Sequence, residues 1–144
     1  ALIGAGCFWG IEEYFQKIKG VIETKVGYSG GNFLNPSYED VCTGTTGHAE
    51  VVLIKYDSNL TYENILDNFW KCHDPSQLNR QGPDVGTQYR SVIFYYDEIQ
   101  KKIAQNSKNK IQTTFSKNIA TTIEEAKELF IAEEYHQCYV KKNF

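Results

Sequence analysis

Strand-like and helix-like segments alternate through the first two-thirds of the chain, in the order strand, helix, strand, strand, helix, strand. This is the order of the ferredoxin-like split βαβ fold, whose antiparallel sheet places the first strand between the third and the fourth. The expected strands are Leu2–Ala5, Val21–Tyr28, Ala49–Tyr56 and Arg90–Tyr96. The sequence therefore predicts an α+β fold with a ferredoxin-like βαββαβ core.

The spacing of apolar residues supports the central strand and both helices. The apolar run Val51–Ile54 predicts a strand that is buried on both faces. Apolar residues three and four apart predict amphipathic helices around residues 11–18, ended by Gly20, and around residues 62–70. The residues that set these patterns are Ile11, Tyr14, Phe15 and Ile18, then Tyr62, Ile65, Leu66, Phe69 and Trp70.

Two long polar segments and a C-terminal extension surround this core. Residues 29–48 and 73–89 are rich in turn-forming residues, and connections this long usually serve function. After the core we expect a helix from Glu98 to about Phe115, a short strand near Ile119–Ile123 and a helix from Glu124 to about Val140. We expect one domain, residues 1–144, with long functional loops and an additional C-terminal helical segment.

Charge and composition argue against several classes of function. A net charge of −3 without a Lys/Arg patch argues against nucleic acid as a partner. No apolar run approaches the roughly 20 residues of a membrane span. The four cysteines are widely spaced, which suits a reducing compartment and gives no zinc-binding pattern. We therefore expect a cytoplasmic monomer without a metal site or a membrane contact.

Cys7 is the candidate nucleophile. It follows the first strand, lies between Gly6 and Gly10, and opens the first helix. Free backbone N–H groups and the positive end of the helix dipole favour an anion there, so we expect a lowered pKa for the thiol. The alternative is a small buried side chain, and spacing alone leaves the two interpretations nearly even.

The same glycines offer a second alternative. Gly4, Gly6 and Gly10 form a weak dinucleotide-binding pattern. Bulky Phe8 and Trp9 occupy the place where backbone would approach a pyrophosphate, and the later units are not parallel βαβ repeats. Aromatic rings beside a thiol at a sheet edge could form the walls of a small apolar pocket. The alternative is ordinary core packing, the usual role of an isolated aromatic pair.

The expected topology brings separate groups of residues to one edge of the sheet. Cys7 follows the first strand, Glu50 opens the third, and residues 84–89 lead into the fourth. Because the first strand runs opposite to both neighbours, its end lies beside their beginnings. A nucleophile, a carboxyl group and the segment 84–89 should therefore meet there.

Five motifs resemble those of the A-type peptide methionine sulfoxide reductases, and they occur in the family's order. They are Gly6–Gly10 (GCFWG), Tyr38–Cys42 (YEDVC), Gly47–Val51 (GHAEV), Gly82–Arg90 (GPDVGTQYR) and Glu134–Gln137 (EYHQ). The resemblance extends from Gly6 to about Asn143. It implies thiol-dependent reduction of methionine S-sulfoxide, protein-bound or free, which repairs proteins after oxidative stress.

The resemblance also implies the roles of individual residues. Cys7 attacks the sulfoxide sulfur and becomes a sulfenic acid, while Glu50 donates a proton from a carboxyl group whose pKa is raised by a partly apolar site. Tyr38 and Tyr89 hydrogen-bond the sulfoxide oxygen, and Asp84 orients the pocket or a water molecule. In addition, Phe8 and Trp9 seat the S-methyl group of the substrate, and His136 borders the site.

A second thiol would then convert the sulfenic acid to a disulfide, which an external dithiol such as thioredoxin reduces. No bound cofactor is expected. The family's usual resolving cysteine lies in a glycine-rich tail that this sequence does not contain, and Cys138 is the candidate in its place. A rigid helix would keep Cys138 from Cys7, and the two alternatives stay open. Cys42 and Cys72 are weaker candidates.

Two other function classes use the same residues. A cysteine hydrolase or acyltransferase would pair Cys7 with His48 or His136, oriented by a third group beside an oxyanion hole. A non-catalytic binding module would use the pocket of Phe8 and Trp9 to hold a methylated ligand. Formation of methionine from its sulfoxide distinguishes the reductase from both.

Overall fold

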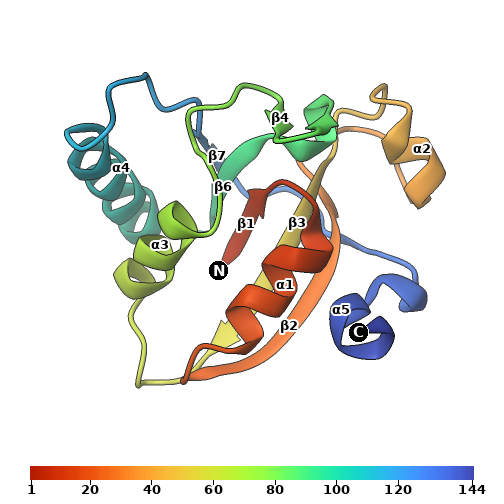
Figure 1. Ribbon diagram of the computed structural model, residues 1–144, viewed down its shortest axis with the longest axis horizontal. Coiled ribbons are helices and arrows are strands. Elements are labelled where there is room, and N and C mark those ends of the chain that lie inside the picture. Colours follow the sequence, from red (N-terminus) through yellow and green to blue (C-terminus); the bar gives the residue numbers. More distant parts are fainter.

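The computed structural model describes residues 1–144 and confirms the α+β fold (Figure 1). Six strands form one sheet in the order β7-β6-β1-β3-β2-β8. Strand β1 lies between β3 and β6 and is antiparallel to both, as the order of elements predicted. The four core strands are β1 (Leu2–Ala5), β2 (Val21–Ser29), β3 (Ala49–Tyr56) and β6 (Ser91–Tyr95).

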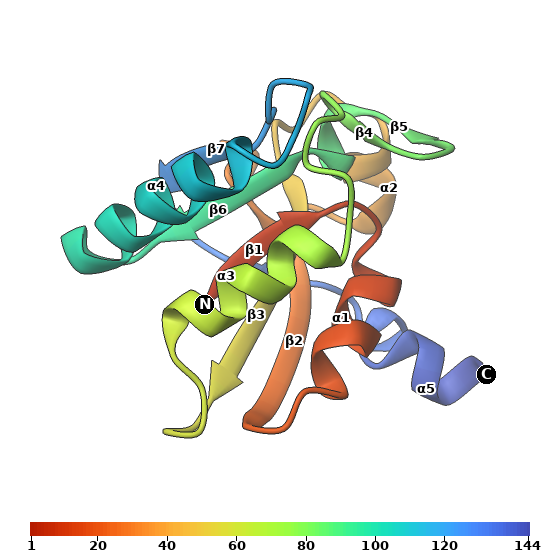
Figure 2. The same cartoon turned by 60° about the vertical axis from the view of Figure 1, so that its left-hand side comes forward.

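The main core lies between the sheet and three helices, which share one of its faces (Figure 2). These helices are α1 (Phe8–Gln16), α3 (Tyr62–Lys71) and α4 (Glu98–Gln112). A capping box fixes the start of α3, because the side chains of Thr61 and Asn64 each accept the other residue's backbone N–H. All five apolar residues that predicted α3 are buried. None of the helices has the length and hydropathy that crossing a bilayer requires.

The long helix expected from Glu124 to Val140 is wrong. That segment instead contains β7 (Thr122–Glu125), β8 (Phe130–Ile131), the 3-10 turn η2 (Glu134–His136) and the short helix α5 (Tyr139–Asn143). Strand β7 pairs with β6 and β8 pairs with β2, so the segment covers both edges of the sheet. Unpaired strand edges need hydrogen-bond partners, and this tertiary demand overrides the local helical spacing.

Two smaller boundaries also differ. The expected strand at Ile119–Ile123 is shifted to β7, where its register is set by pairing with β6. Helix α4 ends at Gln112 instead of Phe115. Beyond β8, the side chain of Gln137 continues the hydrogen bonding to β2 in place of backbone. Its Oε1 accepts the N–H of Val26 at 2.9 Å, and its Nε2 donates to the carbonyl of Val26 at 2.9 Å.

The two long loops contain short elements of their own. The first carries helix α2 (Tyr38–Cys42), and the second carries the hairpin β4 (Arg80–Gln81) and β5 (Asp84–Val85), followed by the 3-10 turn η1 (Thr87–Tyr89). Both figures show the hairpin and α2 near the end of the sheet where β1 turns into α1. Both loops therefore lie near Cys7, which precedes α1.

Candidate active site

A tight turn between β1 and α1 places Cys7 at the N-cap of α1. Gly6 has a φ of 98°, a conformation that L side chains rarely adopt, and a Cβ here would lie 2.8 Å from Cγ of Gln81. The Cys7 side chain is half-buried and makes no cap hydrogen bond, although the nearby backbone N–H groups of Trp9 and Gly10 favour its thiolate. The glycine thus lets the thiol face the first turn of the helix.

Burial outweighs the backbone dipoles at this thiol. The pKa of Cys7 is raised from 9.0 to about 11, first because burial disfavours the thiolate. The N–H groups of Trp9 and Gly10 oppose the rise in pKa, whereas the carboxylates of Glu50 and Asp84 add to it. The lowered pKa expected from the helix dipole is therefore wrong for the unliganded site. That expectation counted the stabilisation of the thiolate by the helix dipole, but not the loss of its hydration on burial.

We expect alkylation of Cys7 to report this raised pKa. Only the thiolate reacts, so the rate of carbamidomethylation by iodoacetamide should rise through pH 7 to 10 without a plateau. Peptide mass spectrometry follows the modification, and the exposed thiol of Cys42 serves as an internal reference. A plateau of the Cys7 rate below pH 7 would contradict the effect of burial and restore the dipole argument.

Glu50, the second residue of β3, is a buried carboxyl group that is 1% exposed. Its Oε1 accepts the backbone N–H of Phe8 at 3.2 Å, and its Oε2 has no partner. Burial raises the pKa of Glu50 to about 8; the N–H of Phe8 opposes this and the charge of Asp84 adds to it. The group therefore holds a proton at neutral pH and is hydrogen-bonded to the residue that follows Cys7, with the raised pKa that the family resemblance implied.

The loops bring two tyrosines and an aspartate to this carboxyl group. The pKa of Tyr89 is raised to about 12, first by burial and then by nearby charges that include those of Glu50, Asp84 and Cys7. Burial also raises the pKa of Tyr38, and nearby Glu50 and Tyr89 contribute. Groups that perturb one another in this way lie within one site. Both phenols stay protonated at neutral pH and can donate hydrogen bonds.

The two aromatic residues that follow Cys7 have different environments. Trp9 is half-buried; its ring stacks on Tyr139 with centroids 3.9 Å apart, and its Nε1 donates to Nδ1 of His136 at 2.9 Å. Phe8 is 1% exposed and packs in the main core against Tyr28, with centroids 5.8 Å apart. Trp9 is therefore placed to form a wall of the site, whereas Phe8 lies in the core and packs on the ring of His136.

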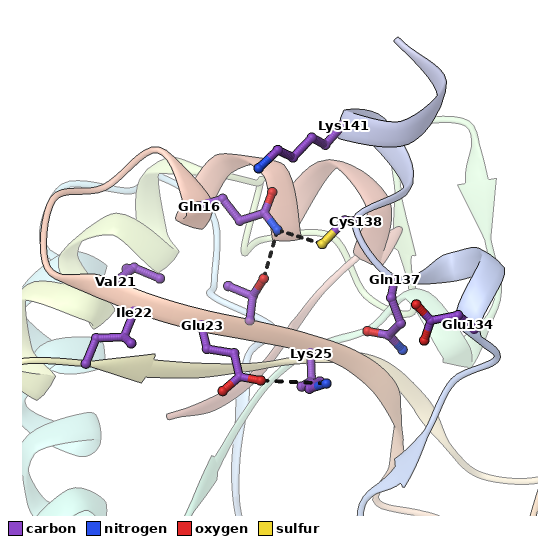
Figure 3. A pocket seen from close by; sticks show the side chains of 10 residues that line it. Gln16, Val21, Ile22, Glu23, Lys25, Glu134, Gln137, Cys138 and Lys141 are labelled. Atoms are coloured by element: carbon purple, nitrogen blue, oxygen red, sulfur yellow. Dashed lines mark hydrogen bonds and ion pairs between the residues drawn. The ribbon is translucent and has the colours of Figure 1, made fainter.

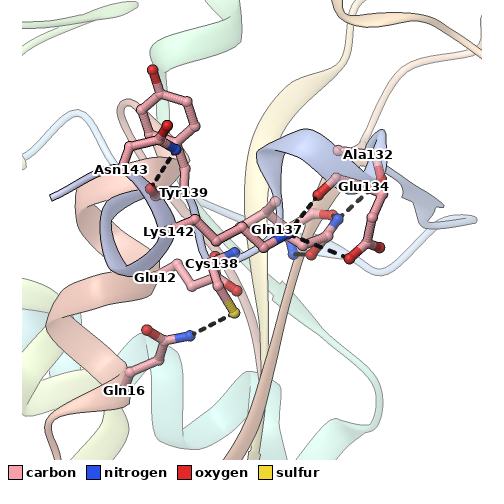
Figure 4. A network of polar contacts seen from close by, with 10 residues as sticks. Glu12, Gln16, Ala132, Glu134, Gln137, Cys138, Tyr139, Lys142 and Asn143 are labelled. Atoms are coloured by element: carbon pink, nitrogen blue, oxygen red, sulfur yellow. Dashed lines mark hydrogen bonds and ion pairs between the residues drawn. The ribbon is translucent and has the colours of Figure 1, made fainter.

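Cys138 lies beside α1, with its sulfur next to Gln16 (Figure 3). Gln16, the last residue of α1, donates to the sulfur of Cys138 at 3.2 Å, and the backbone N–H of Cys138 donates to Oε1 of buried Glu12 at 2.7 Å (Figure 4). The sulfur of Cys138 therefore contacts Gln16 and not Cys7, and both thiols are free. Cys138 precedes α5 and is not inside a long helix.

Neither candidate histidine partners Cys7, although His136 borders the site through its contacts with Trp9 and Tyr38. His48 is buried, its Nδ1 accepts the N–H of Gly31 at 3.1 Å, and its Nε2 donates to the carbonyl of Phe33 at 2.6 Å, so it fixes the loop before α2. Neither His48 nor His136 has a hydrogen bond to Cys7, which removes the support for a hydrolase dyad. No three His, Cys, Asp or Glu side chains are arranged to hold a metal ion.

Comparisons with known proteins identify the family. A family model described as peptide methionine sulfoxide reductase matches residues 1–144. The peptide methionine sulfoxide reductase MsrA of Methanothermobacter thermautotrophicus is 54% identical over 146 residues, which cover 99% of this chain and 86% of the relative. The chain belongs to the A-type peptide methionine sulfoxide reductases. It is an oxidoreductase, as the five motifs predicted, and neither a hydrolase nor a binding module.

Solved structures agree with this assignment. The reductase superimposes on Mxr1 of Saccharomyces cerevisiae in its reduced form with a TM-score of 0.94 and 38% identity, over 99% of this chain and 83% of that one. Methionine sulfoxide reductase A of Corynebacterium diphtheriae gives a TM-score of 0.88 and 37% identity, over 99% and 73%. Mxr1 in complex with Trx2 gives a TM-score of 0.67 and 26% identity, over 96% and 81%.

Sequence reasoning missed residues that the C-terminal segment of the reductase adds to the site. Glu133 hydrogen-bonds the loop that carries Tyr38, and Tyr139 stacks on Trp9. Glu133 directly precedes the motif Glu134–Gln137, and Tyr139 follows it by two residues. The expected helix concealed them, because a continuous helix would have turned these positions in other directions.

Proposed function

We propose that the reductase uses Cys7 to reduce the S epimer of methionine sulfoxide, in proteins or free, through a sulfenic acid on Cys7. One observation carries the proposal: a buried carboxyl group with an unpartnered oxygen is hydrogen-bonded to the residue after the thiol, at 3.2 Å. Sulfoxide oxygen is a very poor leaving group unless it is protonated. A nucleophile beside a protonated Glu50 meets that need.

The proposed reaction balances without a bound cofactor. The sulfur of Cys7 gives up its proton and attacks the sulfoxide sulfur, while Glu50 delivers its proton to the oxygen. The hydroxyl group so formed then passes from the substrate sulfur to the sulfur of Cys7, as the S–O bond of the substrate and the transient S–S bond both break. The proton released by Cys7 returns to Glu50. The products are methionine, whose sulfur has been reduced, and the sulfenic acid of Cys7, whose sulfur has been oxidised.

The neighbouring side chains receive supporting roles. Tyr38 and Tyr89 donate hydrogen bonds to the sulfoxide oxygen and polarise the S–O bond. Asp84 orients the pocket or a water molecule from the hairpin. The ring of Trp9 seats the S-methyl group. The tyrosines would then bind the oxygen, Trp9 the methyl group, and Cys7 would attack the sulfur. Contacts from three directions distinguish the two epimers of a pyramidal sulfur.

Recycling completes the proposed cycle. The yeast relative Mxr1 has been solved in complex with Trx2, and we infer that a thioredoxin-like dithiol also reduces this enzyme. Cys138 is the proposed resolving thiol. Its approach to Cys7 requires local opening, for which the contact of its sulfur with Gln16 must break. The monomeric state, the cytoplasmic location and the absence of nucleic-acid and membrane partners stay predictions.

A single turnover without reductant tests the function. We expect stoichiometric protein to form about one methionine per chain from the S epimer and none from the R epimer, because the sulfenic acid is not recycled. Dimedone present during turnover should label Cys7, as detected by peptide mass spectrometry. Without dimedone, the same digest should contain a disulfide between Cys7 and Cys138.

The outcomes separate the parts of the proposal. Methionine from the R epimer would overturn the stereochemistry, and a dimedone label on another cysteine would overturn the role of Cys7. A disulfide between Cys7 and Cys72 would replace Cys138 as the resolving residue, since Cys7 and Cys72 both line a cavity of about 510 Å³. A Cys138→Ser variant is the matched control, and it should retain the first turnover.

A further inference from the structure

Glu133 bridges the loop that carries Tyr38 to the sheet. It is the half-buried N-cap residue of η2. Its Oε1 accepts the hydroxyl of Tyr28 at 3.0 Å, and its Oε2 accepts the backbone N–H of Tyr38 at 3.1 Å. The hydroxyl of Tyr135 donates to the same Oε2 at 3.3 Å. One carboxylate therefore joins three tyrosines from three parts of the chain.

Helix α2 depends on such outside contacts for its position. It has five residues, of which one, Val41, is buried. Helices this short are unstable alone and take their position from tertiary contacts. The N–H of Tyr38 belongs to the first turn, where no intrahelical acceptor exists, and the capping box of Ser37 and Asp40 does not use it. Glu133 supplies that missing acceptor.

The other end of the bridge is rigid. Tyr28 belongs to β2, is completely buried, and packs against Phe8. Although burial alone would raise the pKa of Glu133, hydrogen bonds from its own backbone, from the N–H of Tyr38 and from the hydroxyl of Tyr28 hold that pKa below the ordinary value. The carboxylate therefore stays ionised at neutral pH and accepts both bonds at once.

We propose that Glu133 is a positioning residue for sulfoxide reduction: it acts through Tyr38, by fixing the start of α2 so that the phenol faces Glu50. The inference rests on the proposed role of Tyr38 in polarising the S–O bond. The ring of His136, with centroids 4.5 Å from that of Tyr38, confines the phenol from the side. Glu133 touches neither substrate nor reacting atoms in this arrangement.

Removing the carboxylate should reduce turnover through Tyr38 alone. In Glu133→Ala the N–H of Tyr38 and the hydroxyl of Tyr28 lose their acceptor, and the start of α2 is no longer fixed. We expect kcat to fall about tenfold, the size of coupling seen between contacting residues. Binding of the S-methyl group by Trp9 is untouched, so KM should change much less than kcat.

A double-mutant cycle with Tyr38→Phe tests this route. We expect Glu133→Ala to lower kcat about tenfold in the wild-type background and less than about twofold when Tyr38 is already Phe. Glu133→Gln keeps one acceptor oxygen and should recover part of the lost rate. Glu134→Ala, which removes the exposed neighbouring carboxylate, is the matched control and should leave kcat unchanged.

Each result bears on one claim. Equal losses from Glu133→Ala in both backgrounds would show a general structural role and overturn the proposal, as would an unchanged kcat. If Tyr38→Phe itself has no effect on kcat, the proposal fails with the role of Tyr38. The proposed reductase function is tested apart from these variants, because wild-type protein must form methionine in a single turnover. Circular dichroism of Glu133→Gln checks that the comparison is made on folded protein.

Discussion

Cys7→Ser is expected to abolish reduction of methionine sulfoxide, lowering kcat by at least about 10³-fold, a loss typical of a removed nucleophile. A serine hydroxyl is a far weaker nucleophile than a thiol, and its oxygen cannot take over the oxygen of the substrate. The measurement follows the conversion of dabsylated methionine sulfoxide to dabsylated methionine by chromatography, with dithiothreitol as the reductant.

The fold should tolerate this change. The Cys7 side chain is half-buried at a helix N-cap, and no hydrogen bond from its sulfur supports another side chain. Cys72→Ser is the matched control, because Cys72 donates to its own helix at the carbonyl of Phe69 and has no proposed part in turnover with dithiothreitol. Full activity in Cys7→Ser, or an equal loss in both variants, would refute the assignment of the nucleophile.

Glu50→Gln is expected to lower kcat by roughly 10²–10⁴-fold, the usual range for a lost general acid. The amide keeps the size of the side chain and can still accept the N–H of Phe8, but it has no proton to give to the sulfoxide oxygen. The dabsyl assay measures this loss. An unchanged rate would remove Glu50 from the reaction.

The pH dependence of kcat tests the same carboxyl group. The pKa of Glu50 is raised to about 8, so the acid form is present below pH 8 and is lost above it. We therefore expect activity to fall as the pH rises through about 8, and the fall should be absent in Glu50→Gln. A fall that persists in the variant would belong to another group.

Thermal melting gives a second check on this pKa. Because the folded-state pKa of about 8 lies above the ordinary 4.5, the protonated carboxyl favours the folded state fully below pH 4.5, and this stability is lost as the pH rises through 8. The Tm of the wild type should therefore fall relative to that of Glu50→Gln between pH 5 and pH 8.5. Parallel Tm curves would mean that burial does not raise the pKa.

The sequence was sufficient for the four central strands and for the residues that meet at one edge of the sheet. The apolar run Val51–Ile54 marked a central strand, and the order of elements placed β1 between β3 and β6. Because strand order fixes which ends are adjacent, Cys7, Glu50 and Tyr89 could be assigned to one edge without coordinates. The resemblance of the motifs to a known family, and not the strand order, implied a raised pKa at Glu50, and burial does raise it.

Effects that depend on distant residues could not be predicted in this way. The segment from Glu124 to Val140 has helical spacing, yet its backbone pairs with both sheet edges, and no local pattern reveals an edge that needs a partner. The pKa of Cys7 failed for a related reason: the helix dipole is visible in the sequence, whereas the burial that outweighs it arises from packing of other elements. Glu133 remained hidden because its three tyrosine partners come from separate segments.

The hydrogen bond between Trp9 and His136 joins residues 127 positions apart. During synthesis the nucleophile leaves the ribosome long before the residues that wall and orient its pocket. Contacts of such long range form late, because the intervening chain must first be ordered. A nascent polypeptide that lacks the segment around His136 would thus carry the reactive cysteine without a finished pocket, and catalytic competence would arise only when that segment docks.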